Sequence, residues 1–177
     1  MKLAAGKIVY KTELFDVKEQ KVLLDGNKKN IYATVERRPT VNIFPLTETD
    51  DLYLIYEYRQ MFRKKILGAI AGHIDDNETS LAAGKRELKE EVGMSASHWE
   101  EIARIEKSAS VIKETSHLFL ARDLEQGTPK PEQGEDITLV KMSLNDAVAK
   151  VMNGEIKVAA TMIGILMLDK LRREKKL

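Results

Sequence analysis

One stretch of the chain, residues 72–94, constrains its fold more than any other, because it combines a helical repeat with two stripes of side chains. It reads GHIDDNETSLAAGKRELKEEVGM. The pattern predicts a helix over Glu78–Val92, with Asn77 as N-cap and Gly93 as the residue that ends it. At about 100° per residue, the apolar stripe can pack onto a sheet. This stripe consists of Leu81, Leu88 and Val92.

The second stripe is acidic and consists of Glu87, Glu90 and Glu91, which fall within an arc of about 100°. Glu87 and Glu91 are like charges four residues apart, which costs about 0.2–0.5 kcal/mol on an isolated helix. Three carboxylates that converge on a hard cation remove this cost, and oxygen ligands suit Mg²⁺ or Mn²⁺. An ordinary solvated acidic face explains the same pattern, so the residues alone leave both interpretations open.

The rest of the chain is rich in predicted strands. They are expected at Lys7–Val17, Lys21–Leu24, Asn30–Val35, Thr40–Leu46, Leu52–Tyr58, Glu100–Glu106, Ser116–Ala121 and Ile137–Met142, with a hairpin turn at Asp25-Gly26-Asn27. Gly68–Gly72 predicts a loop. Ser143 and Asp146 predict the start of a helix that ends at Asn153-Gly154. A last helix from about Ile156 is apolar nearly all round, which predicts burial in the core.

Composition excludes several classes of protein. The 177 residues suffice for one globular domain with a real core. Lys and Arg number 29 against 28 Asp and Glu, so the totals show no basic footprint for nucleic acid. The chain has no cysteine, which excludes disulfides and thiolate metal sites, and its three histidines leave little room for a histidine-rich metal site. No apolar run reaches the roughly 18–20 residues that span a bilayer, and no signal peptide is visible. We therefore expect a cytoplasmic protein with neither nucleic-acid nor membrane partners.

The spacing of residues 72–94 resembles the Nudix box. Gly72 is followed after five residues by Glu78 and after seven more by Arg86-Glu87-Leu88; Glu90-Glu91 and Gly93 then follow at intervals of one residue. The resemblance implies an α/β (α+β) fold, in which a mixed sheet lies between helices in an α/β/α sandwich. It also implies Mg²⁺-dependent hydrolysis of a nucleoside diphosphate linked to another group.

The same resemblance implies a role for each residue of the box. The metal ligands would be the carboxylates of Glu87, Glu90 and Glu91 and the backbone carbonyl of Ala71, with Mn²⁺ as a possible substitute for Mg²⁺. Arg86 would orient these carboxylates, and Glu78 would be its ion-pair partner. Gly72 and Gly93 would shape the ends of the box. Divalent ions would bridge the acidic face to an anionic pyrophosphate and lower the pKa of an attacking water.

From about Lys11 to Leu171 the chain resembles the dimeric ADP-ribose pyrophosphatase branch of this family. This likeness implies that residues 1–38 form a small antiparallel β-sheet that mediates homodimerisation, often by exchange between subunits. Residues 39–177 would then form the hydrolase domain. Arg59 and Glu114 match substrate-contact positions of the branch, although an exposed charge at a strand end also explains Arg59.

Two stretches depart from the branch and bear on the substrate. Gly68 and Ile70 stand where the branch has glutamate and proline, and Ser108-Ala109-Ser110 replaces its Ser-Pro-Gly segment. The favoured reaction is hydrolysis of ADP-ribose to AMP and ribose 5-phosphate. Another nucleotide sugar, such as GDP-mannose, is the alternative substrate. A non-catalytic module that senses a nucleotide is a third hypothesis.

The general base of this branch comes from a loop outside the box. Gly134-Glu135-Asp136-Ile137 resembles the family's position, so Glu135 is the expected base. Glu132 is the second candidate. An ordinary polar loop residue is the remaining interpretation of either side chain.

Overall fold

The computed structural model describes residues 2–3, 6–23, 29–130 and 136–177. The chain forms two compact units. The first comprises Met1–Pro39 and Glu106–Thr115, and the second comprises Thr40–Ile105 and Ser116–Leu177. A short segment from the middle of the chain therefore belongs to the N-terminal unit, in addition to the residues expected there.

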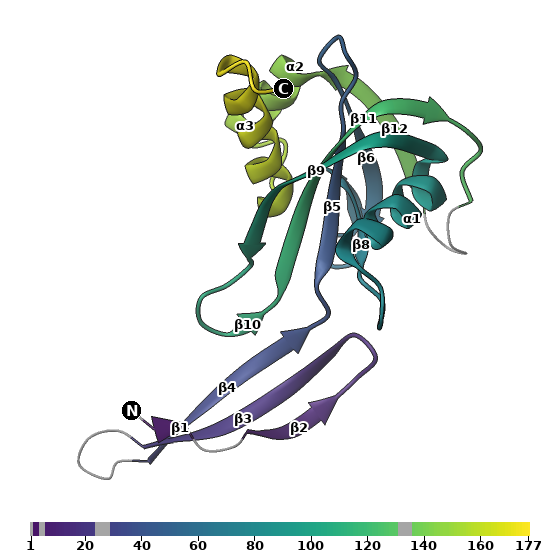
Figure 1. The fold of residues 1–177 in the computed structure, drawn as a ribbon. Helices are drawn as coiled ribbons and strands as arrows, with labels where there is room; N and C mark the ends of the chain where they lie inside the picture. Colours follow the sequence, from purple (N-terminus) through teal and green to yellow (C-terminus); the bar gives the residue numbers. More distant parts are fainter. Residues whose placement is uncertain (1, 4–5, 24–28, 131–135) are drawn as a thin grey trace. The chain divides into compact units, whose positions relative to one another are not determined.

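The first unit is a five-stranded sheet, drawn in purple to blue with the teal strand β10 (Figure 1). Its strands are β1 (Lys2–Leu3), β2 (Lys7–Lys11), β3 (Phe15–Leu23), β4 (Lys29–Arg37) and β10 (Ile112–Lys113). The prediction of one strand over Lys7–Val17 is wrong, because the chain turns at Thr12. The Thr12 hydroxyl accepts hydrogen bonds from the backbone N–H groups of Leu14 at 3.1 Å and Phe15 at 2.9 Å. The predicted hairpin turn at 25–27 lies outside the described residues.

The second unit contains two further sheets, of strand order β8-β5-β11-β9 and β12-β6-β7. Their strands are β5 (Thr40–Pro45), β6 (Asp51–Arg59), β7 (Lys64–Gly68), β8 (Ile70–His73), β9 (Met94–Glu106), β11 (Thr115–Gln126) and β12 (Ile137–Ser143). Strand β5 pairs in parallel with β11 and antiparallel with β8. The four-stranded sheet is therefore mixed, as expected.

The loop predicted at Gly68–Gly72 is wrong, because this stretch belongs to two strands. Gly68 ends β7, which pairs with β6, and Ile70 begins β8, which pairs with β5. Only Ala69 lies between them, and its N–H donates to the hydroxyl of Thr161 at 3.0 Å. The small residues of this stretch let the chain pass directly from one sheet to the other. Glycine and alanine are also common in loops, so the sequence does not distinguish such a crossing from a loop.

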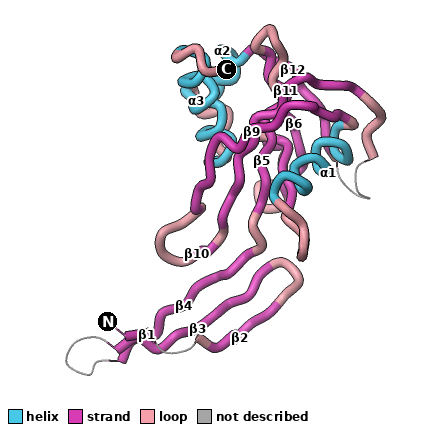
Figure 2. Tube along the Cα trace, viewed as in Figure 1, coloured by secondary structure: helices cyan, strands magenta, loops and turns pink. Residues whose placement is uncertain are grey.

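Three helices cover the sheets of the second unit: α1 (Ser80–Val92), α2 (Leu144–Met152) and α3 (Ala159–Arg173). Alternate side chains of β5 face opposite sides, as a strand requires. Ile43 packs into a cluster with Leu88 of α1, whereas Phe44 packs into a second cluster with helices α2 and α3. Figures 1 and 2 show α1 on one side of the sheets and α2 with α3 on the other. The predicted α/β/α sandwich is confirmed.

Helix α1 begins two residues later than predicted. Thr79, with extended backbone, is the N-cap, and its hydroxyl accepts from the N–H of Ala82 at 3.2 Å. Asn77 has a φ of 68° and therefore cannot act as an extended N-cap residue. Gly93 ends the helix as predicted, with a φ of 69°. A side chain there would overlap the backbone around Pro129.

The other two helices are confirmed, with one correction. Ser143 caps α2 as predicted, and its hydroxyl accepts from the N–H of Asp146 at 3.1 Å. The N–H of Ile156 donates to the carbonyl of Lys150 at 3.0 Å, which closes a turn there and delays the start of α3 to Ala159.

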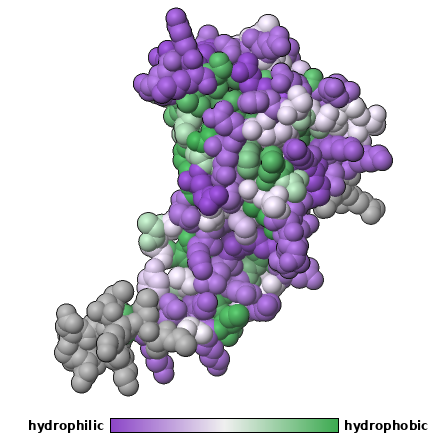
Figure 3. Space-filling view, in the orientation of Figure 1, coloured by the Kyte–Doolittle hydropathy of each residue, from purple (hydrophilic) through white to green (hydrophobic). Residues whose placement is uncertain are grey.

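Helix α3 is buried on one side only, which corrects the prediction of a fully buried helix. It forms the outer layer of the sandwich, so Ile165 and Leu168 are covered while Ile163 and Leu166 are exposed by 37% and 40%. Figure 3 shows hydrophobic surface along the side where α3 lies. No helix in the described part of the chain is long and apolar enough to cross a membrane.

Candidate active site

Arg86 is the centre of a hydrogen-bond network on α1. Its Nε and Nη2 donate to the two carboxylate oxygens of Glu78 at 3.1 and 3.0 Å. Its Nη1 donates to Glu87 at 2.7 Å and to Glu90 at 3.2 Å. Nη2 also donates to the carbonyl of His73 at 3.0 Å. One guanidinium thus fixes the turn before the helix, the end of β8 and two carboxylates of the acidic stripe.

The charges in this network stabilise one another. The hydrogen bond from Arg86 is the main reason why the pKa of Glu78 lies below its usual value. The carboxylates, Glu78 first, raise the pKa of Arg86 above its already high value. The guanidinium therefore favours the charged form of Glu78 and offsets part of the repulsion among the carboxylates around it.

The buried face of α1 lies between the two predicted stripes rather than on the apolar one. Leu88 and Val92 are buried as predicted, but Leu81 is 37% exposed. Glu91, by contrast, is only 7% exposed. The helix packs through Ala83 and Gly84, and this rotation turns part of the acidic stripe toward the protein.

The acidic stripe meets strand β8 at Gly72. A Cβ atom at this position would overlap the carboxylate of Glu87, so the glycine provides the space that this carboxylate occupies. The side chain of Glu87 is 12% exposed, whereas that of Glu90 is 41% exposed. Ala71, the predicted backbone ligand, directly precedes Gly72 in β8 and is therefore next in the chain to the residue that the Glu87 carboxylate approaches.

The donor set fits a hard divalent cation, although its geometry in the described residues is not that of a formed metal site. Residues 2–3, 6–23, 29–130 and 136–177 contain no group of three acidic or histidine side chains arranged to hold a metal ion. Arg86 engages one oxygen each of Glu87 and Glu90. Carboxylates and a carbonyl are nevertheless the ligands of Mg²⁺ and Mn²⁺, and the glycine cradle leaves room for them.

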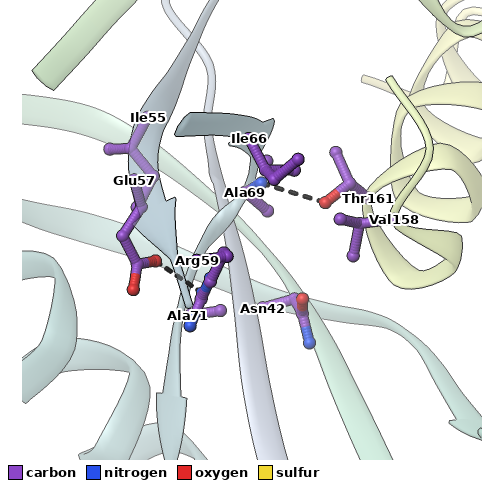
Figure 4. A pocket seen from close by; sticks show the side chains of 10 residues that line it. Asn42, Ile55, Glu57, Arg59, Ile66, Ala69, Ala71, Val158 and Thr161 are labelled. Carbon is purple, nitrogen blue, oxygen red and sulfur yellow. Dashed lines mark hydrogen bonds and ion pairs between the residues drawn. The ribbon is translucent and has the colours of Figure 1, made fainter. Parts of the chain in front are cut away.

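A small cavity lies on the opposite face of β5 and β8 (Figure 4). Ala71 and its register partner Asn42 both line it, together with Arg59, Glu57 and Thr161. Register partners of an antiparallel pair point to the same face. Ala71 therefore adjoins both the carboxylates of α1 and this cavity, which is lined by α3 and the three-stranded sheet.

The sequence profile of the NUDIX domain family matches residues 36–162, which is well over half of the chain. The chain belongs to the Nudix family.

Individual relatives agree with this assignment. The chain is 26% identical over 156 residues to the ADP-ribose pyrophosphatase of Mycobacterium tuberculosis, covering 86% of this chain and 75% of that protein. It is 25% identical over 166 residues to the ADP-ribose pyrophosphatase of Bacillus subtilis, covering 93% and 90%. A crystal structure of an ADP compounds hydrolase has the same fold, with a TM-score of 0.86 and 23% identity over 99% of this chain and 96% of that one. This protein is a Nudix pyrophosphohydrolase that resembles the ADP-ribose pyrophosphatases.

The structure brings some of the predicted site residues of this Nudix protein together and separates others. Arg59 lines the cavity, where its Nη2 lies 2.5 Å from a carboxylate oxygen of Glu57. Glu114 belongs to the first unit, where its buried carboxylate forms ion pairs with Arg37, at 3.1 Å, and Lys107.

Both candidate bases, Glu135 and Glu132, lie outside the described residues. The chain that leads to them is described as far as Lys130, whose N–H donates to the carbonyl of Glu90 at 2.9 Å. The N–H of Gly127 likewise donates to the carbonyl of Gly93 at 2.6 Å. The described segment that leads to the two candidate bases is therefore bonded to the C-terminal end of α1.

Sequence reasoning missed two cavity residues, Asn42 and Glu57. Asn42 is the only amide in the otherwise apolar run from Val41 to Leu46, and it would end up inside the protein on a strand whose two faces are both covered. That position could have drawn attention to it. Glu57 is two residues before Arg59 on β6, so the two side chains lie on the same face of the strand.

Proposed function

We propose that this Nudix protein hydrolyses the pyrophosphate bond of a nucleoside diphosphate sugar, with ADP-ribose as substrate and AMP and ribose 5-phosphate as products. The reaction would depend on Mg²⁺, with Mn²⁺ as a substitute. The observation that carries the proposal is the set of carboxylates on α1 that Arg86 holds against β8. The ADP-ribose assignment is supported by the names of the two relatives that match most of the chain.

Each residue of the set has a distinct task in this proposal. Glu87, Glu90, Glu91 and the Ala71 carbonyl would hold the divalent ion, which supplies charge neutralisation of the pyrophosphate and an acidified water. Arg86 positions two of these carboxylates through its fork of donors, and Glu78 fixes that fork from the other side. The buried positions of Glu87 and Glu91 limit their motion, so the ligands are partly preorganised.

Two further residues act on the substrate in the proposal. Arg59, with its side chain 50% exposed at the rim of the cavity, would bind the substrate's phosphate or the group beyond it. Glu135 would take the proton from the attacking water as general base. Glu114 would contact substrate only in the assembled dimer, since its carboxylate is buried among cations of the first unit.

The dimer is proposed from the surface of the first unit. Several of its apolar side chains are exposed by 40% or more: Ile8, Val9, Tyr10, Leu14, Ile31, Tyr32, Val111 and Ile112. A small sheet with so much exposed apolar surface is marginal by itself, and a second copy of the chain would cover it.

A phosphate-release screen tests the substrate. The protein is incubated with Mg²⁺, a phosphatase that acts only on the products, and a panel of nucleotide sugars that includes ADP-ribose and GDP-mannose. Release from ADP-ribose in Mg²⁺, lost in EDTA and restored by excess Mg²⁺, is the expected result. Preferential release from GDP-mannose would change the substrate and keep the reaction. Binding without release from any nucleotide sugar would favour a sensing module and overturn the proposal.

A further inference from the structure

The cavity contains a buried amide that no described residue satisfies. Asn42 is 5% exposed, lines the cavity, and its side chain makes no hydrogen bond with any described residue. Its amide atoms are not fully enclosed, so they reach the space of the cavity, where a ligand could bond to them. Phe44, two residues along β5 and therefore on the same face as Asn42, is fully buried and apolar, so an apolar residue could pack on this face. Such a group is typical of a binding site whose ligand supplies the missing partner.

Other polar groups converge on the same space (Figure 4). The carboxylate of Glu57 and the guanidinium of Arg59 form an ion pair at one side. At the other side Thr161, whose hydroxyl accepts from the N–H of Ala69, projects from the first turn of α3. This helix has Val158 as its N-cap and no side-chain capping bond, so its start offers N–H donors near the cavity. Ile55 and Ile66 complete the walls.

The balance of charge in the cavity selects a neutral polar ligand. Glu57 and Arg59 cancel, and a phosphate in this space would meet the Glu57 carboxylate. The amide of Asn42 offers both a donor and an acceptor, as a hydroxyl group does. The cavity is also small, which suits hydroxyl groups better than a whole base. Carboxylate and amide side chains that bracket a pair of hydroxyls are a common way to bind a sugar.

We propose that this cavity is a specificity site in which Asn42 binds the hydroxyl groups of the terminal sugar, the one attached to the second phosphate. The proposal rests on the function given above, because Ala71 is both a proposed metal ligand and a wall of the cavity. Because Ala71 lines the cavity, the proposal puts the sugar attached to a pyrophosphate bound at Ala71 at the entrance of the cavity. Glu57 accepts from the same hydroxyls, and Asn42 sets the preference for a hydroxylated group.

The test compares two substrates in three proteins. The substrates are the nucleotide sugar that the wild type hydrolyses in the screen and its analogue with a 2-deoxy terminal sugar. The proteins are the wild type, Asn42→Leu and a control, Thr40→Val. Thr40 lies two residues away on β5 and is also buried, but its hydroxyl is bonded to that of Ser116 at 2.6 Å and does not line the cavity.

We expect the wild type to prefer the hydroxylated sugar by about 10- to 100-fold in kcat/KM, since an unmatched polar group in a dry site discriminates strongly. In Asn42→Leu this preference falls below about threefold, while Thr40→Val keeps it. The melting temperature of Asn42→Leu is equal to or above that of the wild type, because leucine replaces an amide without a partner among the described residues. A residue with a purely structural role would instead lower the melting temperature and leave the preference unchanged.

Two results separate the failure of this inference from that of the proposed function. Hydrolysis by the wild type with the same preference in Asn42→Leu overturns the inference and leaves the reaction intact. Absence of hydrolysis of every nucleotide sugar overturns both. Should Asn42→Leu fail to fold, Asn42→Ala, which removes the amide without adding volume, provides the same comparison.

Discussion

Replacing Arg86 by lysine tests whether the fork of the guanidinium organises the acidic stripe. Arg86 makes five hydrogen bonds through three nitrogen atoms, four of them to carboxylates. A lysine keeps the charge but has one nitrogen atom, so it cannot reach Glu78, Glu87, Glu90 and the His73 carbonyl together. We expect at least two of the five contacts to be lost.

The magnitude follows from the kind of bonds that are lost. Hydrogen bonds to charged groups contribute about 1.5–3 kcal/mol each, and the 29% exposure of the Arg86 side chain favours the lower end. Two such contacts amount to about 3 kcal/mol, which lowers the melting temperature by about 6–12 °C for a chain of this length. Misplacing Glu87 and Glu90 also weakens the metal site, and positioning partners of metal ligands typically contribute 10- to 100-fold in affinity.

The assay combines thermal melts in EDTA with activity measured over a Mg²⁺ titration. Arg86→Lys should melt at lower temperature and need about 10- to 100-fold more Mg²⁺ for half-maximal activity. The matched control is Arg104→Lys. Arg104 is 61% exposed and has one carboxylate contact, to Glu101 at 3.3 Å, so its replacement should change neither value appreciably. Equal melting temperature and equal Mg²⁺ requirement in Arg86→Lys and the wild type would refute the reasoning.

Four further outcomes are expected. Glu91→Gln should lower kcat by at least about 100-fold, because it removes a ligand charge from the metal site, whereas the exposed Glu100→Gln should not. Glu135→Gln should lower kcat by about 10²–10⁴-fold with little change in KM, and a stronger loss in Glu132→Gln would assign the base to that residue instead. The pKa of Glu78 is lowered in the folded protein, so its stabilisation is present above its ordinary value of 4.5 and is lost as pH falls through the folded value. Melting temperatures measured from about pH 6 to pH 3 should accordingly fall more steeply for the wild type than for Glu78→Gln. Light scattering should give twice the chain mass of 20.1 kDa, and a monomer at micromolar concentration would contradict the proposed dimer.

The fold was predictable where a local pattern and the tertiary structure agree. The helix of the box, its end at Gly93 and the Ser143 cap each depend on a few neighbouring residues, and all three are confirmed. The Gly68–Gly72 stretch was mistaken for a loop because its strands are defined by distant partners on β5 and β6, which local propensity does not register. Helix α3 was taken for a buried helix because its exposed side is as apolar as its covered side.

For the site, spacing predicted which residues would gather but not how α1 would be rotated. The sequence separates an apolar stripe from an acidic one, yet packing through Ala83 and Gly84 buries Glu91 and leaves Leu81 exposed. The cavity around Asn42 was not predictable in the same way. Its walls come from β5, β6, β7, β8 and α3, and no local pattern states that these elements meet.

The junction between α1 and the segment after β11 has a consequence for how enzymes of this kind can diversify. Three carbonyl groups in and just after the last turn of the helix receive hydrogen bonds from this segment: Gln126 donates to Val92, Gly127 to Gly93 and Lys130 to Glu90. After residues 131–135, the carbonyl of Asp136 accepts a hydrogen bond from the N–H of Tyr58 at 3.4 Å, and Ile137 begins the pairing of β12 with β6. A change of length between these two anchors keeps the hydrogen bonds that join the segment to α1, so we expect the helix to hold its position. Enzymes of this kind can therefore vary the segment around the proposed base, Glu135, without moving the proposed metal ligands on α1.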